Sequence, residues 1–234
     1  MDVKLYEKEK NMKLGMIIAC EDGIITELEK LTKSNRIEKG CFDVLEYDLG
    51  KNQVYAILSG VGEIMGAAAT ELLIACFGVD KIINVGVVGA LKEDFPPLTV
   101  TYVKDVVHYD FDTSVVDNCP VGKYVYFDSE YVSTDEEFLK DALKIKRLPK
   151  VRCASADKFV EGEKNKTALR ERYDADICDM ESAGVLITCK RNAVPCLMIK
   201  AVSDSHVAGI EMFNELKLKA SLACMEIVKA LLDR

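Results

Sequence analysis

Two acidic residues lie where apolar segments give way to polar ones, and their positions suit acid–base chemistry. Asp204 follows the apolar run 196–202, and Glu181 stands between segment 175–180 and a predicted helix. A carboxyl group at the rim of a buried sheet is partly desolvated, which raises its pKa and lets it serve as a general acid near neutral pH. Both could instead be structural, with Glu181 complementing a helix dipole and Asp204 capping a turn. Since both end a strand, they could face one pocket.

Two glycine-containing segments also follow predicted strands. Residues 59–66 (SGVGEIMG) have three residues between the second and third glycines, where a dinucleotide-binding fingerprint has two. They therefore favour a tight strand-to-helix turn that approaches a ligand or another segment. Residues 84–91 (NVGVVGAL) place Gly86 and Gly89 at the end of a predicted strand. Strand ends of an open α/β sheet border the ligand crevice, although a purely structural strand end fits equally well.

The elements that must position these residues alternate between apolar runs and helical stretches. Strands are predicted at 13–20, 44–48, 54–58, 81–85, 99–107, 151–154 and 196–202, and helices at 21–33, 67–77, 181–190 and 210–232. The 67–77 helix is apolar nearly all round and should be buried, whereas 210–232 has an apolar face at three- and four-residue spacing. The pattern predicts one α/β domain over residues 12–234, with helices packed on a mixed sheet and residues 1–11 as an N-terminal extension.

Composition excludes several classes of function. The 234 residues carry a formal net charge of −8, the opposite sign from most nucleic-acid-binding proteins. The apolar runs are too short to cross a bilayer, and residues 1–11 lack the apolar core of a secretion signal. Nine cysteines with only two histidines show no zinc-binding spacing. We therefore expect a cytoplasmic protein with reduced thiols, no metal, and neither nucleic acid nor membrane as its partner.

Six short segments, taken in order, resemble the nucleoside phosphorylase/nucleosidase superfamily, and within it the 5′-methylthioadenosine/S-adenosylhomocysteine nucleosidases. The segments are 12–19 (MKLGMIIA), 59–62 (SGVG), 84–91 (NVGVVGAL), 155–160 (SADKFV), 179–183 (DMESA) and 203–204 (SD). The resemblance implies a three-layer α/β/α sandwich with a central mixed sheet. It also implies cleavage of a purine–ribose N-glycosidic bond, without metal or cofactor, usually in a homodimer.

The resemblance also implies roles for particular residues. Asp204 resembles the acid that protonates the purine at N7, and Ser203 the residue that places it. Glu181 resembles the carboxylate that holds the ribose hydroxyls. Met180 would lie beneath the sugar, Phe159 would stack on the purine, the backbone of Val160 would read the purine's edge, and segment 108–113 would reach the neighbouring subunit's pocket. Gly89, with Val87, would border the substrate.

The residue that supplies the nucleophile is less clear from the sequence. Phosphorylases bind phosphate with arginine and a serine, but no arginine occurs between Arg36 and Arg147, and Val87 occupies the position of the serine. Water is therefore the favoured nucleophile. An ungapped match puts Gly23 where nucleosidases carry the water-activating glutamate, which leaves Glu21 or Asp22 as the candidate base. A phosphate-dependent phosphorylase and a catalytically silent purine-binding protein remain alternatives.

Overall fold

The computed structural model describes residues 11–20 and 22–233, with only the backbone described for Asp22. The predicted N-terminal extension, apart from its last residue, lies outside this part of the chain, and so does Glu21. None of the described helices is both long and apolar enough to cross a membrane.

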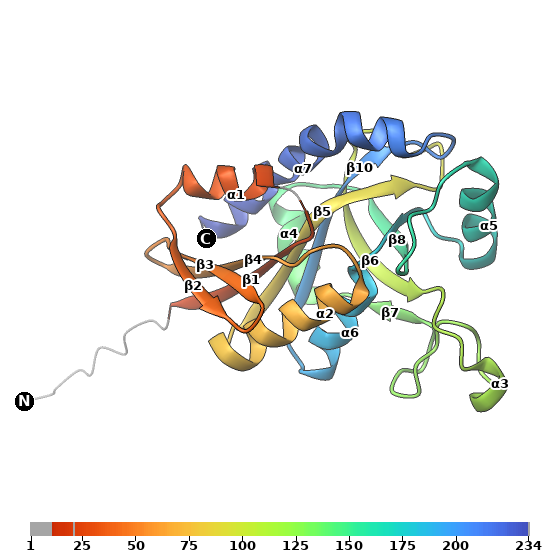
Figure 1. Ribbon diagram of the computed structural model, residues 1–234, viewed down its shortest axis with the longest axis horizontal. Helices are drawn as coiled ribbons and strands as arrows, with labels where there is room; N and C mark the ends of the chain where they lie inside the picture. Colours follow the sequence, from red (N-terminus) through yellow and green to blue (C-terminus); the bar gives the residue numbers. More distant parts are fainter. Residues whose placement is uncertain (1–10, 21, 234) are drawn as a thin grey trace, which may run out of the picture.

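A ten-stranded mixed sheet forms the middle of the molecule (Figure 1). Its strand order is β10-β6-β8-β9-β5-β1-β4-β3-β2, with β7 beside β6 and a further pairing between β10 and β5. The strands are β1 (Met12–Ile18), β2 (Asn35–Lys39), β3 (Phe42–Asp48), β4 (Asn52–Leu58), β5 (Lys81–Ala90), β6 (Val100–His108), β7 (Tyr131–Ser133), β8 (Lys150–Ser155), β9 (Ile177–Asp179) and β10 (Cys196–Asp204). β5 pairs with β1 over its first half, with β10 along most of its length, and with β9 at its carboxyl end.

Helices cover both faces of this sheet. One hydrophobic cluster joins the sheet to α1 (Asp22–Glu29), α4 (Glu136–Ile145) and α7 (Ile210–Leu232). A second cluster joins the opposite face to α2 (Glu63–Leu72), the π-helix η1 (Leu73–Phe77) and α6 (Ser182–Arg191). The shorter α3 (Ser114–Asp117) and α5 (Glu163–Tyr173) follow β6 and β8. The predicted α/β fold, a three-layer sandwich around a mixed sheet, is confirmed.

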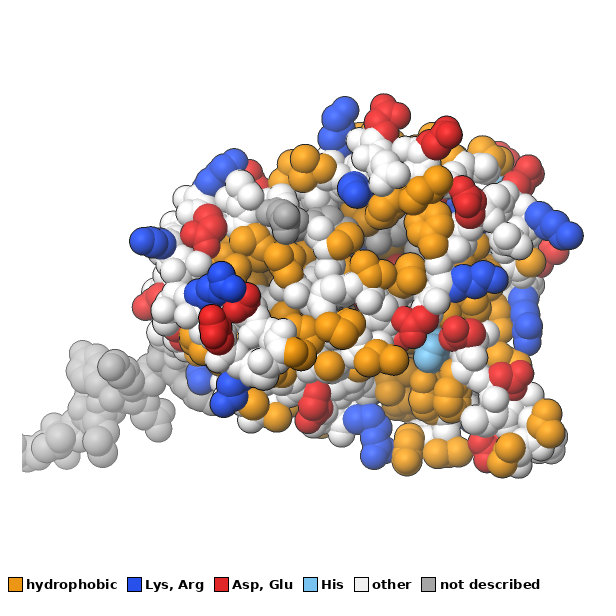
Figure 2. All heavy atoms as spheres, in the orientation of Figure 1, with side chains coloured by type: hydrophobic (Ala, Val, Ile, Leu, Met, Phe, Trp, Pro, Cys, Tyr) orange, Lys and Arg blue, Asp and Glu red, His pale blue; other side chains and the backbone are white. Residues whose placement is uncertain are grey.

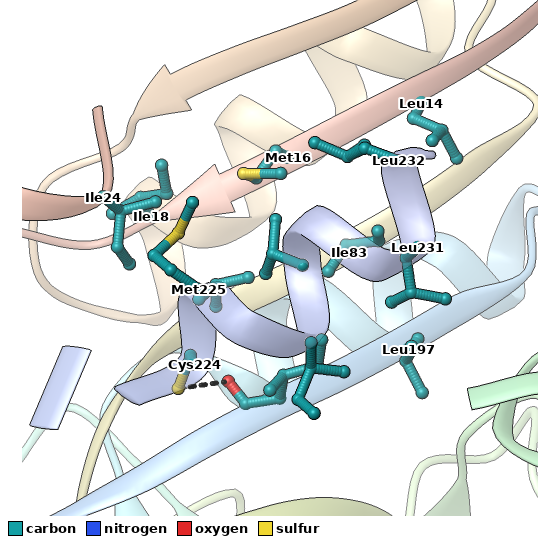
Figure 3. Close-up of a cluster of buried hydrophobic side chains, with 14 of the residues drawn as sticks. Leu14, Met16, Ile18, Ile24, Ile83, Leu197, Cys224, Met225, Leu231 and Leu232 are labelled. Carbon is teal, nitrogen blue, oxygen red and sulfur yellow. Dashed lines mark hydrogen bonds between the residues drawn. The ribbon is translucent and has the colours of Figure 1, made fainter. Parts of the chain in front are cut away.

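The long helix α7 is held by its apolar face, as its three- and four-residue spacing predicts. Cys224, Met225 and Leu231 pack against side chains of β1, β5 and β10, including Met16 and Leu197 (Figure 3). The Cys224 thiol also donates to the Ile199 carbonyl oxygen at 3.8 Å. Cys224 acts here as a small core residue. Cys20, Cys41 and Cys76, in contrast, are exposed.

Two predicted elements need correction. The strand expected at 81–85 continues to Ala90, because residues beyond Gly86 still pair with β10 and β9. The helix expected at 67–77 begins at Glu63 and ends in the π-helical turn η1.

The expectation that this helix is buried on all sides is also wrong. Within residues 67–77, Ala69 and Leu73 are buried but Ala68, Ala75 and Cys76 are exposed. Ile64, in the part of the helix that precedes this range, is 76% exposed. Apolar side chains gather on the surface over the area of α2 (Figure 2). A helix that is apolar all round has the same sequence pattern whether its second face meets the core or the surface, so the pattern could not distinguish the two.

Candidate active site

A cavity of about 230 Å³ lies at the carboxyl-terminal ends of the parallel strands β1, β5 and β10, beside β9 and the start of α6. Carboxyl ends of parallel strands form the ligand crevice in open α/β sheets. The cavity is lined by Ala19, Cys20, Val61, Gly86, Val87, Val88, Gly89, Lys158, Phe159, Val160, Cys178, Asp179, Met180, Glu181, Lys200, Ser203, Asp204 and Phe213.

Every site residue predicted from the sequence whose side chain is described lines this cavity. They are Asp204, Glu181, Phe159, Val160, Met180, Ser203, Val87 and Gly89. Residues far apart in the chain thus meet at one place. The two candidate bases cannot be located in the same way, because Glu21 and the side chain of Asp22 lie outside the described part of the chain.

Asp204 lies at the end of β10, where the pairing with β5 shifts register so that Ser203 is the extra residue. Such a shift re-aims the side chains beside it. The Ser203 hydroxyl is 3.0 Å from Asp204 Oδ1 and 3.2 Å from the Val88 carbonyl oxygen. Burial raises the pKa of the Asp204 carboxyl, although hydrogen bonds from Lys166 and Ser203 oppose the increase. The group therefore has an environment suited to a general acid.

Gly89 faces the Asp204 carboxyl from β5. A Cβ atom at this position would lie 3.2 Å from Asp204 Oδ2 and 3.2 Å from the Cys178 sulfur. Glycine at this position thus leaves room for the Asp204 carboxyl group. This explains the residue more specifically than its place near the end of a strand does.

Lys166 is the residue at this site that the sequence did not predict. It lies on α5 with 0% of its surface exposed, and its ammonium group donates to Asp204 Oδ2. It also donates to the carbonyl oxygens of Ser205 at 2.7 Å and Ala208 at 2.9 Å. A protonated lysine has three N–H donors, and here each one has an acceptor. In the sequence, Lys166 is one of many polar residues of a short helix and reads as a surface residue.

Glu181 precedes α6 and is buried, with 6% of its surface exposed. Its Oε1 accepts a hydrogen bond of 3.0 Å from the backbone N–H of Gly62. Gly60 and Gly62 have φ values of +83° and +110°, which favour glycine. The 59–66 segment is therefore a tight turn that delivers a backbone N–H to the Glu181 carboxylate, in agreement with the sequence interpretation.

A buried ion pair lies beside Glu181. Lys200 Nζ is 2.8 Å from Asp179 Oδ2, and both side chains are buried. Burial on its own would raise the pKa of Asp179, but the Lys200 charge and hydrogen bonds from Lys200, Ser155 and Ser182 hold it below its ordinary value. The lysine keeps its charge despite its burial, because Asp179 and Glu181 together raise its pKa.

A second buried carboxyl, that of Glu63 at the start of α2, joins this network. Ser155 Oγ is 2.5 Å from Glu63 Oε1 and 2.6 Å from Asp179 Oδ1. A hydroxyl has one proton to donate, and the ionised Asp179 takes it, so the remaining contact needs a proton on Glu63. In agreement with this, burial and the negative charge of Asp179 raise the pKa of Glu63 to about 8.

Apolar side chains form the rest of the cavity wall. Phe159 is 38% exposed and packs edge-to-face on Phe213 of α7, with ring centroids 5.6 Å apart at 75°. Val160, Met180 and Val87 complete this wall. A cavity that is apolar on one side and carries carboxyl groups on the other fits a flat heterocycle joined to a polar group. Among the residues whose side chains are described, no cluster of His, Cys, Asp and Glu is placed to hold a metal ion.

The sequence is similar to those of known nucleosidases. It is 26% identical over 198 residues to the aminodeoxyfutalosine nucleosidase of Campylobacter jejuni, covering 82% of this chain and 86% of that protein. It is 25% identical over 230 residues to the 5′-methylthioadenosine/S-adenosylhomocysteine nucleosidase of Shewanella piezotolerans, covering 95% of this chain and 100% of that protein.

Solved structures share the fold along almost the whole chain. The futalosine hydrolase of Helicobacter pylori superposes with a TM-score of 0.90 at 23% identity, covering 95% of this chain and 98% of the other. A 5′-methylthioadenosine/S-adenosylhomocysteine nucleosidase from Colwellia psychrerythraea in complex with adenine gives a TM-score of 0.86 at 22% identity, covering 96% of each chain. The pattern of the phosphorylase superfamily matches residues 13–233. The resemblance found in the six short segments is therefore confirmed, and the chain belongs to the phosphorylase superfamily.

Proposed function

We propose that this protein is a purine nucleosidase that hydrolyses the N-glycosidic bond of an adenine nucleoside, with 5′-methylthioadenosine or S-adenosylhomocysteine as the substrate class. The observation that carries the proposal is that Asp204 and Glu181 line one cavity beside the aromatic ring of Phe159. The similarity to nucleosidases at 25–26% identity supports the reaction class.

Asp204 is the proposed general acid. Purine anions are poor leaving groups, so the departing base must receive a proton before or while the bond breaks. Burial raises the pKa of Asp204, so its carboxyl group holds a proton more readily than an exposed aspartate does. The O–H bond of the acid breaks, an N–H bond forms at N7, and the electron pair of the N9–C1′ bond goes to the purine. Such help is worth ~10²–10⁴-fold in rate.

Glu181 is the proposed partner of the sugar. As the glycosidic bond breaks, the ribose gains positive charge, which a fixed carboxylate stabilises more in the transition state than in the ground state. The Gly62 N–H fixes one oxygen of this carboxylate, and the ammonium group of Lys200, whose pKa Glu181 helps to raise, supplies a positive charge nearby. Met180, next in the chain, would lie beneath the sugar, and Phe159 would cover the face of the purine.

Water is the nucleophile that the cavity favours. No arginine is among the described residues that line it, and of its two lysines, Lys200 is paired with Asp179. Val87 offers no hydroxyl to a phosphate oxygen. A phosphorylase would need donors in a fork around the phosphate anion, so phosphorolysis is the less favoured reaction.

Glu21 or Asp22 is the proposed base that activates this water. Cys20, the residue directly before them in the chain, lines the cavity. Position 23 is less suited to a longer side chain, because a Cβ on Gly23 would come within 2.5 Å of Leu218 Cδ1 on α7 and would require that side chain to move. If neither acidic residue acts as a base, the protein is a purine-binding homologue without turnover, which is the second candidate function.

Release of free base from purified protein tests these alternatives. The protein is incubated with 5′-methylthioadenosine, adenosine or inosine, with and without phosphate, and the products are separated by chromatography. We expect adenine from 5′-methylthioadenosine without phosphate, and loss of this activity when Glu21 and Asp22 are both replaced by alanine. A sugar 1-phosphate formed only with phosphate would indicate a phosphorylase. Calorimetric binding of adenine without any released base would indicate the silent homologue.

We also propose that the protein acts as a homodimer through the exposed apolar face of α2. This face carries Ile64 and Met65 of α2, with Val61 in the turn before the helix, and all three are exposed. Exposed apolar patches of this kind mark protein–protein interfaces. Because the first turn of α2 contacts Glu181 through Gly62, such an interface would lie close to the cavity.

A further inference from the structure

The buried lysine on α5 bears directly on the acid of the proposed reaction. Lys166 is fully buried, and the Asp204 carboxyl next to it is 2% exposed. Charged lysines are almost never fully buried unless they are paired. A buried ammonium next to the residue that must donate a proton changes the energy of that donation, whichever nucleoside is bound.

The hydrogen bonds divide the two oxygens of Asp204 between two partners. Lys166 donates to Oδ2, and the Ser203 hydroxyl is 3.0 Å from Oδ1. An ammonium group has only N–H donors, so a proton on Oδ2 would face an N–H proton of Lys166 and prevent the hydrogen bond. The proton of the neutral acid therefore belongs on Oδ1. There it can be donated to Ser203 Oγ, whose own proton then goes to the Val88 carbonyl oxygen, 3.2 Å away.

Lys166 also holds the chain that follows Asp204. Its other two protons go to the carbonyl oxygens of Ser205 and Ala208, which belong to the loop between β10 and α7. One ammonium group thus fixes both the carboxyl group and the loop beside it. The alkyl chain reaches this place from α5, an element that contributes no residue to the cavity wall.

The other titratable groups around the cavity do not supply the positive charge that Lys166 places against the Asp204 carboxyl. Cys178 on β9 faces the same carboxyl, but burial raises the pKa of its thiol to about 12, so the thiol is neutral. Lys200 on β10 is engaged by Asp179, and His206 in the loop lies 3.4 Å from Glu93. The remaining titratable side chains described at the cavity wall are Cys20, Lys158 and Glu181.

We infer that Lys166 is a positioning residue for the general acid: it confines the transferable proton to Asp204 Oδ1 and stabilises the carboxylate that remains after the purine has taken that proton. The inference rests on the proposed function. In the step itself, the Oδ1–H bond breaks, the N7–H bond forms, and the new carboxylate is paired with the Lys166 ammonium. Lys166 keeps all its protons and touches no substrate.

The alkaline limb of the pH–rate profile tests the inference. Turnover needs protonated Asp204, so it falls as the pH rises through the pKa of this group. A positive charge this close lowers the pKa of an aspartate by about 1–3 units. In Lys166→Met and Lys166→Gln, the midpoint of the alkaline limb in kcat/KM should therefore move up by about one pH unit or more. Lys164→Met, which removes an exposed lysine of the same helix, should leave the midpoint unchanged.

A second measurement separates this inference from the proposed function. Titration of the Asp204 carboxyl by carbon-13 NMR, with Asp204→Asn to assign its signal, needs no turnover. Its pKa should be higher in Lys166→Gln than in the natural protein and unchanged in Lys164→Met. If Lys166→Met does not fold, Lys166→Gln keeps a hydrogen-bond donor and supplies the same comparison. An unchanged pKa and an unchanged alkaline limb would overturn the inference, whereas failure of the natural protein to release any base would overturn the proposed function alone.

Discussion

At the scale of single residues, the site depends on where charges are buried. Sequence reasoning could place Asp204 and Glu181, because each stands at or just after the end of an apolar segment and in a short segment that resembles a known pattern. It could not place Lys166, because nothing in the sequence of α5 distinguishes a buried lysine from its exposed neighbours. It could not place Glu63 either, whose burial depends on the packing of α2 on α6.

Replacing Asp204 by asparagine should abolish most of the turnover. Asparagine fills the same space but cannot donate the acid's proton, so kcat should fall by ~10²-fold or more. At a pH where Asp204 is ionised, the change also leaves the Lys166 ammonium buried without its carboxylate, which costs about 3–5 kcal/mol in the free energy of unfolding. Steady-state kinetics and thermal unfolding measure the two effects.

The double variant Asp204→Asn with Lys166→Met is the matched control for that prediction. It removes both charges, so its Tm should lie above that of Asp204→Asn alone while turnover stays low. Recovery of turnover together with Tm would mean that the asparagine acts only by unfolding the site, which would contradict the role of Asp204 as the acid.

Replacing Glu181 by glutamine should lower kcat/KM by ~10²–10³-fold, the cost of removing one group that stabilises transition-state charge. Glutamine Oε1 can still accept the Gly62 N–H, so the Tm should change little. Kinetics with 5′-methylthioadenosine and a thermal melt provide the two readings. A variant that melts normally and turns over at the natural rate would show that Glu181 only anchors the 59–62 turn.

At the scale of elements, the hydrogen-bonded chain Glu63–Ser155–Asp179–Lys200 ties α2, β8, β9 and β10 together. The strands β1, β4, β6, β8 and β10 agree with the sequence prediction to within a few residues, because each is an apolar run with clear ends. The helices α4 and α5 and the strands β2 and β7 were not predicted. They are short or mostly polar, and tertiary contacts decide their structure.

The raised pKa of Glu63 makes the stability of α2 packing depend on pH. Its pKa rises from 4.5 to about 8, so the folded state binds a proton that the unfolded state releases. The stabilisation is fully present below about pH 4.5 and is lost as the pH rises through 8. The Tm of the natural protein should therefore fall between pH 6 and pH 9.

Glu63→Gln should show a smaller fall, because glutamine resembles the protonated acid and carries no charge to bury. Glu71→Gln, on the exposed side of the same helix, should keep the natural pH dependence. Differential scanning calorimetry at several pH values measures both. Equal slopes for the natural protein and Glu63→Gln would mean that Glu63 does not titrate in this range.

At the scale of the whole molecule, the fold brings residues from the six segments that carry the family resemblance to one cavity. The α/β class and the mixed sheet could be predicted from alternating apolar runs, and the three layers from the family resemblance. The exposed face of α2 could not be predicted from the sequence, because a side chain that meets a partner and one that meets the core have the same apolar character. The face is visible only once α6 and the sheet are seen to cover the opposite side.

The proposed homodimer gives a prediction at this scale. Sedimentation equilibrium at micromolar concentration should give twice the 26.0 kDa of one chain. Ile64→Asp should shift the protein toward the single chain, because it places a charge in the centre of the apolar face. Leu31→Asp, at another exposed apolar position (42% exposed), should not. A natural protein that sediments at 26.0 kDa would contradict the dimer.

A crystal structure of the protein with adenine tests most directly whether Asp204 and Glu181 serve one reaction. We predict that adenine lies in the cavity with its flat face against Phe159, that Asp204 Oδ1 is within hydrogen-bond distance of N7, and that Glu181 lies on the side of N9, where the sugar was attached. Adenine bound elsewhere, or bound in the cavity with both carboxyl groups out of reach of the base and the sugar position, would contradict the account.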